Sequence, residues 1–323
     1  MGDLTGLVLQ VLVMVAGIGV LYFGAEWLVR GAARLAGTLG VSPIVVGLTV
    51  VSFGTSAPEL VVAVVASVRG NADLAIGNVL GSNLANIGLI LGITALIRPL
   101  DVAARVVWRE VPLMLLVTAA LFPLASDHAL SRGDGVILLM ALAGYLLFVF
   151  QSVEGEAPEI MEEYEDFMKA ASQRPGRLNL TDVGLVVGGC AGLVAGGYAI
   201  VEGAVAVATY LGVSQVVIGL TVVAVGTSLP ELATSVVAAL RKEADIAVGN
   251  IIGSNIFNVA AILGTASVVR PMHISESVLT RELPAVMVMS VMLLPMLRTR
   301  WRIDRWEGAV LLVCYLGLGA WLL

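Results

Sequence analysis

The sequence predicts an all-α membrane protein of ten transmembrane helices, arranged as two inverted-topology five-helix repeats. Of its 323 residues, 59% are hydrophobic and only 13% are charged, and the hydrophobic residues form long blocks separated by short polar breaks. A helix needs about 20 apolar residues to cross ~30 Å of hydrocarbon, and the blocks have that length. The alternating segments of an outer-membrane barrel are absent. An internal repeat and a repeated polar motif support the same prediction.

The apolar blocks define the expected spans, and one long polar segment divides them into two groups of five. The first block runs to about residue 36, which is too long for a signal-peptide core. The two cysteines, Cys190 and Cys314, lie inside apolar blocks and are expected to be small packing residues. The expected spans are residues 6–35, 42–68, 73–97, 107–126, 134–153, 180–210, 214–240, 245–269, 278–297 and 305–323.

The polar segment 154–179 separates a first repeat, 1–153, from a second, 180–323. It begins with seven acidic residues and ends with basic residues, proline and glycine. A charged run of this kind is typical of a solvated linker, which is our interpretation; a calcium-sensing role for its acids is the alternative.

The second half of the chain repeats the first. A shift of 172 residues places 49–99 over 221–271 without a gap, and 27 of these 51 positions are identical. Because each half has an odd number of spans, the second half enters the membrane from the opposite side. This is the inverted-topology repeat common among secondary transporters.

The basic residues predict the orientation in a cell membrane, plasma or inner. Of the 18 lysines and arginines, 14 fall on one face, and the other face holds only Arg69, Arg132, Arg270 and Arg281. The positive-inside rule places the richer face in the cytoplasm. Both termini are then external and the linker 154–179 is cytoplasmic.

The motif GTSAPE at 54–59 returns as GTSLPE at 226–231. A proline inside a helix removes one backbone hydrogen bond, and exposed backbone is tolerated at this depth only against protein or a wet cavity. A carboxylate in mid-membrane is costly and marks a functional site by default, so Glu59 and Glu231 are the main candidates. Polar or backbone groups at helical spacing accompany each glutamate: Ser52, Thr55 and Ser56 in the first half, and Ala224, Thr227 and Ser228 in the second.

The following span contributes a second polar segment in each half, GNVLGSNLAN at 77–86 and GNIIGSNIFN at 249–258. Its glycines allow close helix packing, as small residues do in membranes. A lone serine or threonine in a membrane helix usually bonds its own backbone, and a lone asparagine more often serves packing. The candidates from this segment are Ser82, Asn86, Ser254 and Asn258, with Asn78 and Asn250 one turn earlier.

These residue types favour the binding of a hard cation. Two close carboxylates in a low dielectric need a counter-ion or a proton, and no lysine or arginine lies near either motif. Every candidate ligand is an oxygen, which favours Na⁺, Ca²⁺ or Mn²⁺ over zinc or copper. No histidine or lysine is placed to activate the serines, and no phosphate-binding loop is present. We therefore expect neither an enzyme nor a resident cofactor.

At these motifs the chain resembles the cation/calcium exchanger superfamily, specifically its prokaryotic sodium/calcium exchanger branch. The resemblance implies an antiporter that moves Ca²⁺ out as Na⁺ moves in, by alternating access. It also implies that helices 6–35 and 180–210 form a long tilted pair that slides against the other eight. The ion ligands that it implies are Ser52, Thr55, Ser56, Glu59, Ser82, Asn86, Ala224, Thr227, Ser228, Glu231, Ser254 and Asn258, with Ser52 and Ala224 acting mainly through backbone carbonyls.

One departure from the family pattern bears on coupling. Some members carry aspartate where this chain has Asn258, and in the potassium-dependent branch that aspartate is tied to K⁺ transport, so the resemblance implies K⁺ independence. The segments 78–86 and 250–258 lack the acid of proton-coupled relatives, which favours Na⁺. The alternatives are an H⁺-coupled Ca²⁺ exchanger, a Mn²⁺ exchanger, or a cation channel. The expected surroundings are the lipid bilayer, with Ca²⁺ and Na⁺ as substrates, no nucleic acid and no obligate protein partner, so that a monomer would suffice.

Overall fold

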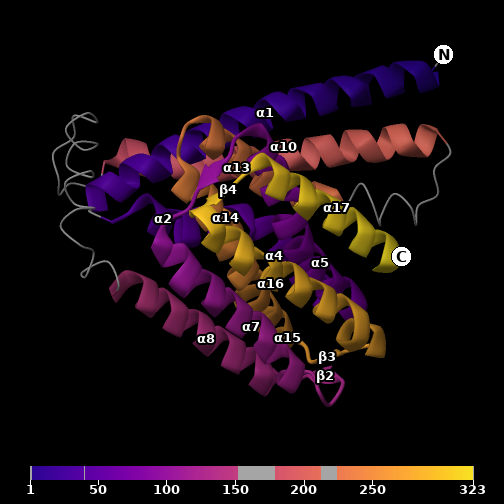
Figure 1. The fold of residues 1–323 in the computed structure, drawn as a ribbon. Helices are drawn as coiled ribbons and strands as arrows, with labels where there is room; N and C mark the ends of the chain where they lie inside the picture. Colours follow the sequence, from indigo (N-terminus) through magenta and orange to yellow (C-terminus); the bar gives the residue numbers. More distant parts are fainter. Residues whose placement is uncertain (1, 40, 152–178, 212–223, 323) are drawn as a thin grey trace.

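The computed structural model describes residues 2–39, 41–151, 179–211 and 224–322, and in these ranges helices cover the expected spans. Helix ends agree with the sequence prediction to within a few residues, except that the first helix is longer than 6–35. The first part of the expected span 214–240 lies outside the described residues. Figure 1 shows the long helices α1 and α10 side by side along one edge of the bundle.

The first half contains α1 (Gly2–Leu39), α2 (Pro43–Val46), η1 (Gly47–Val51), α3 (Ser52–Thr55), α4 (Ala57–Val68), α5 (Ala72–Ala85), η2 (Asn86–Ile90), α6 (Leu91–Ile97), β1 (Leu100–Asp101), η3 (Val106–Glu110), α7 (Val111–Leu124), β2 (Ala129–Leu130) and α8 (Arg132–Gln151). The second half contains α10 (Leu180–Tyr210), α12 (Ala224–Thr227), α13 (Leu229–Leu240), α14 (Ala244–Phe257), η6 (Asn258–Leu263), α15 (Gly264–Val269), β3 (Met272–His273), η7 (Val278–Glu282), α16 (Leu283–Arg300), β4 (Arg302–Ile303) and α17 (Arg305–Leu322).

Length and hydropathy alone identify seven of the described helices as membrane-spanning, or eight if the bent pair Pro43–Thr55 and Ala57–Val68 is one span. Two further segments complete the expected set. The stretch α12–α13 is the described part of the expected span 214–240, and α17 has Arg305 and Glu307 in its first turn. The chain is thus a helical membrane protein with the predicted series of spans.

Helices α1 and α10 form an antiparallel pair whose backbones approach very closely. Glycines recur every seven residues on each helix and in register with the 172-residue shift: Gly17, Gly24 and Gly31 on α1, and Gly189, Gly196 and Gly203 on α10. A Cβ atom added at Gly24 would lie 2.7 Å from the backbone nitrogen of Leu193, and one at Gly196 would lie 2.5 Å from that of Leu21. Small residues permit this approach, which gives dense van der Waals contact.

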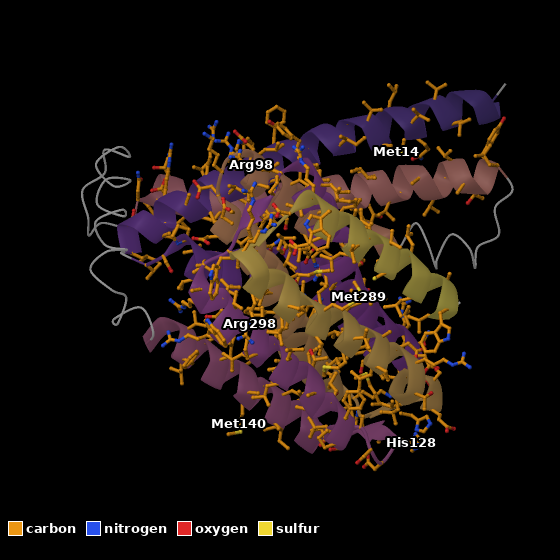
Figure 2. All side chains as sticks on the ribbon, in the orientation of Figure 1. Met14, Arg98, His128, Met140, Met289 and Arg298 are labelled. Carbon is orange, nitrogen blue, oxygen red and sulfur yellow. The ribbon has the colours of Figure 1, made fainter. Side chains whose placement is uncertain are left out.

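The two halves are interlocked by two short antiparallel sheets, each made of one strand from each half. Strand β1 pairs with β4, with Leu100 opposite Ile303, and β2 pairs with β3, with Leu130 opposite Met272. The shift of 172 carries Leu100 of β1 onto Met272 of β3. Arg98 and Arg298 lie close in sequence to β1 and β4, and His128 lies next to β2. Figure 2 shows the two arginines far from His128, so the two sheets belong to opposite ends of the bundle.

The repeated GTSxPE motif breaks its helix as the proline predicts. The segments before and after Ser56 are bent by 48°, and Ser56 has φ −81° and ψ 6°. Ser228 has nearly the same conformation, φ −90° and ψ 5°, so α4 and α13 both restart inside the bundle. A further irregularity, not predicted from sequence, is a π-helical segment that begins at Asn86 in one half and at Asn258 in the other. Single π turns inside α-helices occur frequently at functional sites.

Candidate cation site

The two glutamates lie in the first turns of α4 and α13, at the centre of the interlocked halves. Glu59 is fully buried and Glu231 is 1% exposed. Ser56, three residues before Glu59, is hydrogen-bonded to Glu231, so the two glutamates belong to one site. The N-terminus of a helix carries a partial positive charge and unpaired N–H groups, so each restarted helix offers some compensation for its carboxylate.

The hydrogen bonds of the motif residues cross between the two halves. Ser56 Oγ donates to Glu231 Oε1 over 3.0 Å, and Thr55 Oγ1 donates to Asn250 Oδ1 over 3.0 Å. In the other direction, Ser228 Oγ lies 3.5 Å from Ser82 Oγ. The sequence suggested a polar stripe on one helix face. The break at Ser56 replaces that stripe with contacts to the opposite repeat.

Several buried oxygen atoms of the site have no hydrogen-bond partner among the described residues. Buried polar groups are almost always hydrogen-bonded, so a group of unpaired oxygens in one place indicates a ligand. Hydroxyl, amide and carboxylate oxygens are also the ligands that hard cations prefer. The unpaired oxygens are both carboxylate oxygens of Glu59, Oε2 of Glu231, Oδ1 of Asn86, Oγ of Ser254 and Oδ1 of Asn258.

Of the remaining candidate ligands, Ser52 already uses both its hydroxyl and its carbonyl in hydrogen bonds. Ser52 Oγ donates to the carbonyls of Gly47 and Asn250, and the carbonyl of Ser52 accepts from Ser56 N and Thr55 Oγ1. Ala224 begins α12, and Thr227 ends it. The side chain of Ala224 lies outside the description.

Four buried polar residues beside the site are not among the ion ligands expected from sequence: Asn250, which was noted only as a neighbour of those ligands, and Asn83, Thr234 and Ser235, which were not noted. Asn250 donates to Ser235 Oγ over 3.1 Å and lies 3.5 Å from the carbonyl of Glu231. Asn83 accepts from Asn258 and donates to the carbonyl of Asn255, so it ties the second polar segments of the two halves together. Asn83 could have been found from the sequence, because the 172-residue shift places Asn255 at the same position of the other repeat. Ser235 and its neighbour Thr234 have no polar counterpart in the first half, so a search for repeats missed them.

The arrangement provides two buried carboxyl groups surrounded by neutral oxygen donors. Among the described residues, no group of three or more histidine, cysteine, aspartate or glutamate side chains could hold a metal ion. A divalent cation would neutralise the glutamate pair, and the asparagines, serines and threonines could complete its coordination. Ca²⁺ takes 6–8 oxygens in flexible cages of this type.

The chain matches known proteins over nearly its whole length. The family model described as sodium/calcium exchanger protein matches residues 9–151 and again 181–323. The protein named CaxA of Alkalimonas amylolytica is 39% identical over 316 residues, which cover 96% of this chain and 97% of the relative. The sodium/calcium exchanger MaX1 of Methanosarcina acetivorans is 34% identical and covers 94% of this chain and 95% of its own.

Comparison with solved structures gives a match of similar extent. A structure of the sodium-calcium exchanger NCX_Mj, soaked with 2.5 mM Na⁺ and 10 mM Sr²⁺, superposes with a TM-score of 0.84 at 30% identity, and the match covers 97% of this chain and 99% of that one. The two family matches coincide with the two repeats, and each contains one buried glutamate and its motif. The chain therefore belongs to the sodium/calcium exchanger family.

Proposed function

We propose that this protein exports Ca²⁺ in exchange for Na⁺ by alternating access at the Glu59–Glu231 site, without a requirement for K⁺. The unpaired oxygens of the two buried carboxylates are the observation that carries the proposal. The relatives support it, since MaX1 and NCX_Mj are named as sodium/calcium exchangers.

The same residues account for the coupling of the two fluxes. Two uncompensated carboxylates are costly to hold in the dry interior while the site changes its exposure. Ca²⁺, or two or more Na⁺, would remove that cost. The empty site would then reorient slowly, so net movement of one ion would require return of the other. The amides of Asn86 and Asn258 add ligands without adding charge, which fits a site that uses neither a third acid nor K⁺.

The orientation proposed from the basic residues places the Arg241 end of α13 in the cytoplasm and the Arg69 end of α4 outside. The two ends differ in packing, although α4 and α13 are related by the repeat. Helix α1 packs on α13, and α10 makes no comparable contact with α4 in the described part of the chain. Val65 on α4 is 42% exposed, but its counterpart Val237 on α13 is 5% exposed. We infer an outward-facing conformation.

The uncovered face of α4 at the external end borders a surface groove. It has a volume of about 510 Å³ and is lined by Val61, Val62, Val65, Ala66, Arg69, Asn71 and Leu74, all from α4, α5 and the turn between them. At the cytoplasmic end the corresponding surface of α13 is covered by α1, and an ion pair closes it. Arg241 Nε donates to Glu26 Oε2 over 2.6 Å, and Glu26 also pairs with Arg30 at 2.8 Å.

Replacing Arg241 by glutamine should favour release of the α1–α10 pair from α13. We expect a cysteine at Val237 to react about two- to fivefold faster with a membrane-impermeant thiol reagent in this variant, because a partly exposed ion pair contributes up to about 1 kcal/mol. The background must lack Cys190 and Cys314. The matched control is Arg69→Gln, because Arg69 has no ion pair among the described residues. Equal acceleration in both variants would contradict the assignment.

The proposed function is tested by calcium flux in proteoliposomes with Na⁺, K⁺ and H⁺ gradients imposed one at a time. We expect Ca²⁺ uptake with an outward Na⁺ gradient, no change when K⁺ is omitted, and little uptake with a proton gradient alone. Proton-driven uptake at a similar rate would favour the H⁺-coupled alternative. Electrical conductance without Na⁺ on the opposite side would favour a channel.

A further inference from the structure

The hydroxyl of Thr234 differs from the other buried threonine hydroxyls of the bundle. Thr49, Thr94 and Thr118 each donate to the carbonyl four residues earlier, over 2.7 to 2.9 Å. This is the usual solution for a hydroxyl in a membrane helix. Thr234 is also fully buried, but its Oγ1 has no partner among the described residues. An unpaired buried hydroxyl loses its hydrogen bonds to water without replacement, so a compensating ligand is expected.

Thr234 belongs to a polar cluster on the face of α13 that carries Glu231. Residues three and four positions apart on a helix lie on one face, about 5–6 Å apart at Cβ, so Thr234 and Ser235 both follow Glu231 on that face. Asn250 holds Ser235 through a 3.1 Å hydrogen bond and is itself held by Thr55. Glu231 contributes a second unpaired oxygen, Oε2.

The other repeat has no such cluster. The shift of 172 residues places Val62 and Ala63 opposite Thr234 and Ser235, while Asn78 corresponds to Asn250. The asparagine bond to the glutamate carbonyl is shared, since Asn78 lies 3.4 Å from the carbonyl of Glu59. The hydroxyl groups of Thr234 and Ser235, in contrast, are present in the second repeat alone. The extra oxygens therefore lie on one side of the central site, toward Arg241.

We propose that Thr234 and Ser235, with the free oxygen of Glu231, form an additional position for a dehydrated monovalent cation one helical turn from the central site. A divalent ion typically takes 6–8 oxygens with more than one carboxylate. This cluster offers a single carboxylate and neutral hydroxyls, which suits Na⁺. The inference rests on the proposed Na⁺/Ca²⁺ exchange. It adds that Na⁺ dependence differs between the two membrane faces, because Val62 and Ala63 provide no matching position.

The test compares Thr234→Val, which keeps the shape and removes the hydroxyl, with Thr234→Ser, which restores it. Ca²⁺ exchange is measured in inside-out and right-side-out vesicles while Na⁺ is varied on one face. We expect Thr234→Val to raise the half-maximal Na⁺ concentration about five- to tenfold on the Arg241 face only, which corresponds to the loss of one hydroxyl ligand. Thr234→Ser should return it toward the wild-type value. The mirror variant Val62→Thr should not change Na⁺ dependence on that face.

Thermal unfolding in detergent provides a second readout. A ligand that binds the folded state stabilises it in proportion to its affinity, so Thr234→Val should reduce stabilisation by Na⁺ more than stabilisation by Ca²⁺. Equal Na⁺ dependence in the valine and serine variants, or an equal change on both faces, would overturn the additional position. Absence of Na⁺-driven flux in the wild type, with Na⁺ stabilisation still sensitive to Thr234→Val, would instead overturn the proposed exchange.

Discussion

Glu59→Gln and Glu231→Gln should each reduce Na⁺-driven Ca²⁺ exchange by at least about 100-fold. Removing one charge from a compensated buried group costs ~3–5 kcal/mol, and each 1.4 kcal/mol corresponds to a factor of ten in affinity. Glutamine keeps the size of the side chain and one oxygen, so the loss would come from charge rather than packing. Flux in proteoliposomes and Ca²⁺-dependent thermal stabilisation would both report the change.

Glu276→Gln is the matched control, because this glutamate is exposed in the first helical turn before η7, outside the site. It should leave exchange and stabilisation unchanged. Because each repeat supplies one carboxylate, both glutamine variants should be defective. Full exchange by either glutamine variant would rule out the shared carboxylate site.

Gly189→Ala and Gly196→Ala should impair both stability and transport. The added Cβ atoms would lie 2.5 Å from the backbone nitrogens of Leu28 and Leu21, which cannot rotate away, so the helices must separate by on the order of 1 Å. Overpacking of this kind costs ~1–3 kcal/mol at each site. Because α1 and α10 contact each other along their length, we expect the pair to move as one body, and loosening it should uncouple the movement from the ion site.

The controls are Gly19→Ala on α1 and Gly184→Ala on α10, where an added Cβ meets no described atom within 4 Å. These variants should retain wild-type flux and thermal unfolding temperature. If all four variants behaved alike, the close approach of the backbones would have no special role, because alanine favours a helix more than glycine does at every one of these positions.

Much of the fold could be predicted from sequence because the bilayer imposes simple constraints. Span lengths follow from the hydrocarbon thickness, and the positions of Glu59 and Glu231 follow from the cost of a buried carboxylate. The kink at Ser56 follows from Pro58, which cannot donate a backbone hydrogen bond. The glycines Gly17, Gly24 and Gly31 also recur at the 172-residue shift, although they lie outside the contiguous match of 49–99 with 221–271.

Contacts between the halves could not be predicted from local pattern. Ser56 and Glu231 are 175 residues apart, and only their packed geometry shows that one donates to the other. Thr234 and Ser235 were missed for a different reason. Repetition was the criterion for selecting polar residues, and a feature that distinguishes one half from the other is invisible to it.

The two small sheets have a consequence for biosynthesis. Strand β1 at Leu100–Asp101 leaves the ribosome long before its partner β4 at Arg302–Ile303 is made. The five helices of the first repeat therefore enter the bilayer with this strand unpaired and can reach their final packing only after β4 has been made. A nascent chain truncated shortly before Arg302 should remain far more sensitive to protease than one extended by the last helix.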